Sequence, residues 1–129
     1  MKSFTKRYTI RAPAEKVWGA LVDPGLIERW GAGPGVVMSE EPGTPFRLWG
    51  GDIHGKNVEV ERWRKLVQEW YGGDWERPSI VTFLLSEKGG VTEVELIHGN
   101  LPDDEAASVN KGWDDYYMLP LKELAEKSP

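Results

Sequence analysis

The feature that most constrains the fold is a strongly amphipathic segment near the end of the chain. After Leu101-Pro102, apolar residues recur at spacings of three and four, as they do on one face of an α-helix. This face consists of Val109, Trp113, Tyr117, Leu121 and Leu124. A helix with so apolar a face, about twenty residues long, must pack against another element. Pro120 falls inside it and should kink it.

Most of the chain before this helix is predicted to form short strands. Polar and apolar residues alternate from Lys2 to Arg11, which is typical of a half-buried strand. Further strands are expected at Val36–Ser39, Pro45–Trp49, Gly55–Trp63, Lys65–Trp70, Ser79–Ser86 and Thr92–His98. Glycine-containing turns lie between several of them, and connections this short favour an antiparallel meander, because parallel strands need long crossovers.

Two short helices are expected between the first strand and the others. Pro13 suits the first turn of one helix, where its missing N–H is not needed, and Glu15 complements the helix dipole. Asp23 is the predicted N-cap of a second helix that has Pro24 at its first position. The glycine-rich segment from Gly31 to Gly35 then ends helical structure. It follows a helix and precedes a strand, so it does not fit a phosphate-binding loop.

This order of elements predicts an α+β protein with a helix-grip fold, in which one curved antiparallel sheet wraps around the C-terminal helix. A sheet with one apolar face must cover it, and the final helix is the only expected element long enough to do so. Residues 1–129 fit a single domain. An apolar cavity is expected between the sheet and the helix.

Composition excludes several classes of function. The net charge is −5 and the 16 Lys and Arg are scattered, which argues against nucleic-acid binding. Because there is no Cys and only two His, we expect no disulfide, no metal site and no cofactor. The N-terminus lacks the apolar core of a signal peptide, and no apolar run is long enough to enter a membrane, so a cytoplasmic location is expected.

Several motifs resemble one known family. Gly112-Trp113, followed by Tyr116-Tyr117, is similar to the signature of the C-terminal domain of activators of the ninety-kilodalton heat-shock protein ATPase. The same family pattern resembles the segments 50–55, 92–96 and 101–105. The resemblance implies a START-like fold of the polyketide cyclase-like superfamily, a chaperone partner and a role in stress response. The N-terminal domain that makes the principal contact with the chaperone in that family is not in this sequence.

The aromatic residues point to a pocket, because they exceed what a core of this size needs. Trp113 and Tyr117 are the leading candidates for its wall, since one helical face carries both. The full set of predicted ligand-binding residues is Trp113, Tyr117, Trp30, Phe46, Trp49, Trp70, His98 and Leu121. The alternative is that most of these side chains simply fill the core.

No catalytic constellation is evident, so a non-enzymatic binding domain is favoured, with a small hydrophobic molecule or a chaperone as its partner. One alternative is a cyclase- or isomerase-like enzyme that uses His98 as acid and base, since His98 should point to the same side as Val94 and Leu96. Another is a homodimer formed through a strand edge or the hairpin around Trp75. His54 is expected in a loop or at a strand edge, and the Asp52 carboxylate on a solvated sheet face.

Overall fold

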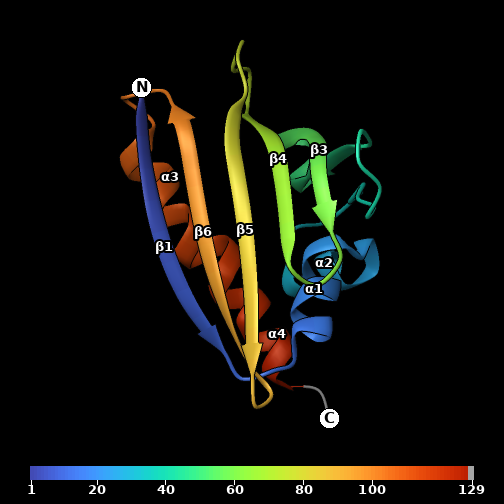
Figure 1. Cartoon of the computed structure of the whole chain (residues 1–129). Coiled ribbons are helices and arrows are strands. Elements are labelled where there is room, and N and C mark those ends of the chain that lie inside the picture. Colours follow the sequence, from blue (N-terminus) through green and yellow to red (C-terminus); the bar gives the residue numbers. More distant parts are fainter. Residues whose placement is uncertain (128–129) are drawn as a thin grey trace.

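The computed structural model describes residues 1–127 and contains one six-stranded antiparallel sheet. The strands are β1 (Lys2–Ile10), β2 (Pro45–Leu48), β3 (Ile53–Glu61), β4 (Lys65–Gly72), β5 (Ser79–Lys88) and β6 (Val91–Leu101). Their order across the sheet is β1-β6-β5-β4-β3-β2, so β1 and β2 form its two edges. Strands β2 to β6 form the predicted meander, and β1 joins its far side beside β6 (Figure 1).

Two short helices follow β1, as predicted. These are α1 (Ala14–Val22) and α2 (Pro24–Trp30). The Asp23 carboxylate accepts hydrogen bonds from the N–H groups of Gly25 at 2.8 Å and Leu26 at 3.4 Å, which confirms it as the N-cap of α2. Pro13 lies just before α1, whose first N–H, that of Ala14, donates to Glu87 of β5 at 2.8 Å.

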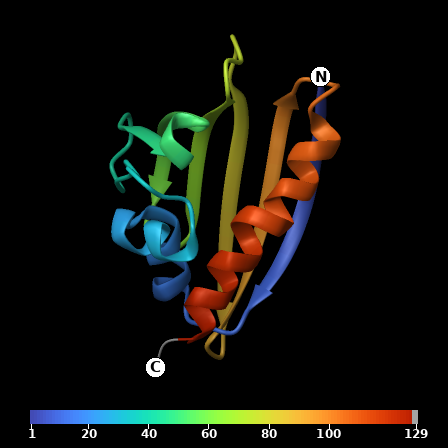
Figure 2. The same cartoon turned by 180° about the vertical axis from the view of Figure 1, so that it is seen from behind.

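The C-terminal helix lies across one face of the sheet and runs diagonally over the strands (Figure 2). It has three consecutive parts: α3 (Ala106–Gly112), the π-helical segment η2 (Trp113–Met118) and α4 (Leu119–Lys127). In η2 the N–H of Leu119 donates to the carbonyl of Asp114, five residues earlier. A kink was expected at Pro120, and the structure has a wider, π-helical turn just before this residue. The wider turn makes room for the Pro120 ring, which would clash with the preceding turn of a regular α-helix.

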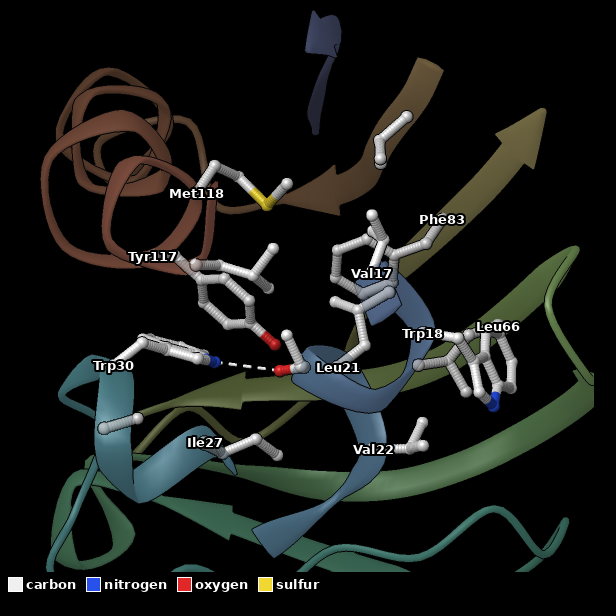
Figure 3. Packing of buried hydrophobic residues seen from close by; sticks show 14 of the residues in the cluster. Val17, Trp18, Leu21, Val22, Ile27, Trp30, Leu66, Phe83, Tyr117 and Met118 are labelled. Atoms are coloured by element: carbon white, nitrogen blue, oxygen red, sulfur yellow. Dashed lines mark hydrogen bonds between the residues drawn. The ribbon is translucent and has the colours of Figure 1, made fainter. Parts of the chain in front are cut away.

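The core fills the space between the sheet, the C-terminal helix and α1. Figure 3 shows Tyr117 and Met118 of the helix facing Val17 and Leu21 of α1, with Phe83 of β5 nearby. All five side chains are almost completely buried. This arrangement confirms the helix-grip fold, and it turns the aromatic face of the helix towards the sheet.

The segment Val36–Ser39 was predicted as a strand, and this prediction is wrong. Only Val37 forms a bridge, with Arg47 of β2. The carbonyl of Ser39 instead accepts a hydrogen bond from the buried Asn57 side chain at 2.8 Å, and Gly35 before it has a left-handed backbone with φ of 72°. Because Gly35 turns the backbone and the Asn57 side chain binds the Ser39 carbonyl, this segment does not form the regular backbone hydrogen bonds of a strand.

Candidate functional site

A cavity of about 370 Å³ opens between the C-terminal helix and the β3–β4 side of the sheet. The helix lines one side of it, and the sheet with the short 3₁₀ turn η1 (Trp49–Gly51) lines the other. The lining residues are Trp49, Asp52, Ile53, Trp70, Val109, Gly112, Trp113, Tyr116 and Tyr117. Asp52 is the only charged residue among them, so the wall is aromatic and largely apolar.

The aromatic rings of this wall are in contact with one another. The ring centres of Trp113 and Tyr117 are 4.6 Å apart, and those of Trp70 and Trp113 are 5.5 Å apart. Trp49, from η1, lies 6.0 Å from Tyr117 in an edge-to-face arrangement. Ring contacts at these distances are individually favourable and restrict one another's rotation, so this part of the wall is preformed.

Gly112 contributes open space to the cavity. Its φ of −61° and ψ of −35° are ordinary helical values that any residue adopts. A Cβ atom placed there would meet nothing closer than the ring of Tyr116 at 3.9 Å. Glycine inside a helix costs about 1 kcal/mol relative to alanine. Neither backbone strain nor crowding requires glycine here, and its visible effect is to leave this part of the cavity empty.

Tyr117 and Tyr116 differ sharply in their surroundings. The Tyr117 ring is buried, and burial raises the pKa of its hydroxyl above the usual range, so this group stays neutral. Tyr116, at the preceding position of the helix, is 69% exposed. Tyr116 therefore forms the outer rim of the cavity, whereas Tyr117 forms part of its floor.

His98 lies behind the aromatic wall in a fixed hydrogen-bond chain. The Trp113 indole N–H donates to Nδ1 of His98 at 2.9 Å, which leaves Nε2 as the donor to Oγ of Ser79 at 2.8 Å. The Ser79 hydroxyl donates in turn to the carbonyl of Trp70 at 2.7 Å. His98 is fully buried, and desolvation lowers its pKa to about 3. This neutral ring fixes the orientation of Trp113 and does not line the cavity.

The structure brings four of the eight predicted ligand-binding residues into the cavity wall: Trp49, Trp70, Trp113 and Tyr117. The other four lie outside the lining, in the core around it: Trp30, Phe46, His98 and Leu121. Trp30, for example, packs 4.8 Å from the Tyr117 ring while its indole N–H donates to the carbonyl of Ala20 (Figure 3). A ligand-binding role for these residues stays a prediction.

The remaining lining residues were not predicted as site residues. Tyr116 and Gly112 stand beside Trp113 in the recognised motif, so the motif itself carried that signal. Asp52 and Ile53 reach the cavity because the glycine turn before them reverses the chain. Among residues 1–127, no group of three or more His, Asp or Glu side chains is placed to hold a metal ion. No helix in this part of the chain is long and apolar enough to cross a bilayer.

Comparison with known proteins agrees with this geometry. The sequence profile of the family described as activator of Hsp90 ATPase homolog 1-like protein matches residues 11–126. The chain belongs to this family. Among the family's curated proteins, the Hsp90 co-chaperone AHA1 of Saccharomyces cerevisiae is 25% identical over 125 residues, which is 88% of this chain and 35% of the yeast protein. The chain thus spans about a third of the length of this relative.

Solved structures show the same fold. An HSP90 activator from Plasmodium falciparum superposes with a TM-score of 0.89 at 24% identity, covering 96% of both chains. The Aha1 dimer from Colwellia psychrerythraea gives a TM-score of 0.84 at 22% identity, covering 98% of both chains. At these identities the likeness concerns the fold alone, which is the START-like helix-grip arrangement predicted for this family member.

Proposed function

We propose that this domain binds a small hydrophobic molecule in the cavity between its C-terminal helix and its sheet. The observation that carries the proposal is the open space beside Gly112, which the chain keeps at a cost in helix stability. Cavities of a few hundred cubic ångströms with aromatic walls are the usual form of small-molecule sites. The buried, neutral His98 has both ring nitrogens occupied, which favours binding over acid–base chemistry in this cavity.

The test compares two substitutions at Gly112 in a titration with 3-ethylindole, a neutral aromatic probe. Gly112→Leu places a side chain in the cavity without straining the helix, so it should abolish binding measured by isothermal titration calorimetry. Gly112→Ala is the matched control, and it should retain binding while raising the unfolding free energy by about 1 kcal/mol. Equal affinity of both variants for the probe, or no binding by the unmodified domain, would reject the proposal.

The second candidate function is docking on a ninety-kilodalton heat-shock chaperone. Membership of the activator family supports it, as do two large exposed side chains three residues apart on the helix. Tyr116 is 69% exposed and Leu119 is 52% exposed. A chaperone ATPase assay with the Tyr116→Ala/Leu119→Ala double variant tests this role. If this face docks on the chaperone, the unmodified domain and Gly112→Leu should both stimulate the chaperone ATPase, and the double variant should not.

A further inference from the structure

The charge at the cavity mouth indicates the kind of ligand that the cavity accepts. Among residues 1–127, Asp52 is the only charged residue that lines the cavity, and none of the lining residues is Lys or Arg. Its carboxylate makes no hydrogen bond or ion pair with the residues that the structure describes. An anionic ligand would meet this carboxylate with no cationic side chain in the cavity wall, whereas a cationic ligand would find a partner in it that no other side chain occupies.

The backbone of Asp52 is held in place on both sides. Its N–H donates to the carbonyl of Trp49 at 3.2 Å, and its own carbonyl accepts from the N–H of Gly73 at 2.7 Å. The turn before it requires left-handed backbone at Gly50 and Gly51, with φ of 67° and 103°. The backbone of Asp52 is therefore fixed at the junction where η1 ends and β3 begins, and the residue lines the cavity together with the aromatic residues.

The aromatic wall adds a second attraction for positive charge. The faces of Trp and Tyr rings carry negative potential and attract ammonium groups, more strongly where water is excluded. Trp49, Tyr116 and Tyr117 line the cavity together with Asp52. Arg47 lies beside the turn, where its guanidinium donates to the carbonyl of Gly50 at 3.4 Å, but it forms no ion pair with Asp52 among the described residues.

We propose that the cavity selects apolar molecules that carry a protonated amine, with the apolar part between Trp70 and Trp113 and the ammonium group beside Asp52. This inference rests on the proposed binding function and names its ligand class. It discriminates against fatty acids and other carboxylates of similar size, because their charge would lie beside an unpaired carboxylate.

The test uses three probes that share one indole ring: tryptamine, neutral 3-ethylindole and indole-3-propionate. We expect tryptamine to bind about threefold to tenfold more tightly than 3-ethylindole, and indole-3-propionate to bind more weakly than both. The preference for tryptamine should shrink as salt is added, because Asp52 is exposed and its charge is screened. Calorimetric titrations at low and high ionic strength measure both effects.

Two variants with the same change of charge separate a local effect from a global one. Asp52→Asn should lower the affinity for tryptamine about threefold relative to that for 3-ethylindole measured on the same variant. Asp104→Asn is the matched control, since Asp104 is exposed and does not line the cavity, and it should change neither affinity. Circular dichroism confirms that both variants are folded.

The outcomes distinguish the two proposals. The charge selectivity is refuted if 3-ethylindole binds and tryptamine binds no more tightly. It is also refuted if Asp104→Asn lowers the affinity for tryptamine as much as Asp52→Asn does. In both cases the proposed binding function stands. If none of the three probes binds, both proposals are refuted. Tighter binding of indole-3-propionate than of tryptamine would also overturn the inference.

Discussion

At the scale of single residues, His98 makes the stability of the domain sensitive to acid. Its pKa falls from 6.5 to about 3 in the folded protein because burial disfavours the charged ring. The unfolded chain therefore binds a proton that the folded protein does not, so the contribution of His98 is complete above pH 6.5 and is lost as the pH falls towards 3. We expect the unfolding free energy to drop by about 2 kcal/mol between pH 7 and pH 5 from this residue alone.

Denaturant unfolding at both pH values measures this effect. In His98→Gln the difference should shrink by that amount, since an amide can still donate and accept hydrogen bonds but does not titrate. If His98→Gln loses as much stability between the two pH values as the unmodified protein, the assignment of the effect to His98 is wrong.

Gly55 is the second residue whose role can be tested directly. An added Cβ would lie 1.8 Å from the carbonyl oxygen of Glu69 on the neighbouring strand, and backbone cannot move aside cheaply. We expect Gly55→Ala to lower the unfolding free energy by about 3 kcal/mol or more. In Gly99→Ala, also in a strand, the nearest atom would be 3.9 Å away, so that variant should be nearly neutral. Similar melting temperatures for the two variants would contradict the requirement for glycine at position 55.

At the scale of elements, the N-cap of α2 gives a prediction of known size. Asp23 accepts two backbone hydrogen bonds at the start of a helix that carries the buried Ile27 and Trp30. Asp23→Ala should cost about 1 kcal/mol of unfolding free energy, and Asp23→Asn, which keeps the acceptor, should cost only a small part of that. Thermal unfolding of the two variants side by side checks this, and equal losses would mean that the cap is not what stabilises α2.

The sequence predicted helices and strands correctly where residues close together in the chain determine the secondary structure. Alternation identified β1, Asp23 and Pro24 marked the start of α2, and the three-and-four spacing around Trp113 identified the C-terminal helix. It failed where distant residues decide. The carbonyl of Ser39 accepts a hydrogen bond from the Asn57 side chain, 18 residues away, and no local pattern links the two residues.

At the scale of the whole molecule, the sequence predicted the architecture but only part of the cavity wall. Apolar character alone does not tell a lining residue from a core residue, which is why Trp30, Phe46 and Leu121 were predicted beside Trp113. Gly112 and Asp52 also line the cavity, but one is small and the other is charged, and their role depends on the space between two elements. That space becomes visible only when the helix is placed on the sheet.

The central claim, that a small hydrophobic molecule occupies this cavity, is tested most directly by intermolecular nuclear Overhauser effects in solution. With 3-ethylindole added, the account predicts contacts from the probe to the ring protons of Trp113, Tyr117 and Trp70, and their loss in Gly112→Leu. Contacts confined to the outer face of the sheet, or unchanged contacts in Gly112→Leu, would contradict it.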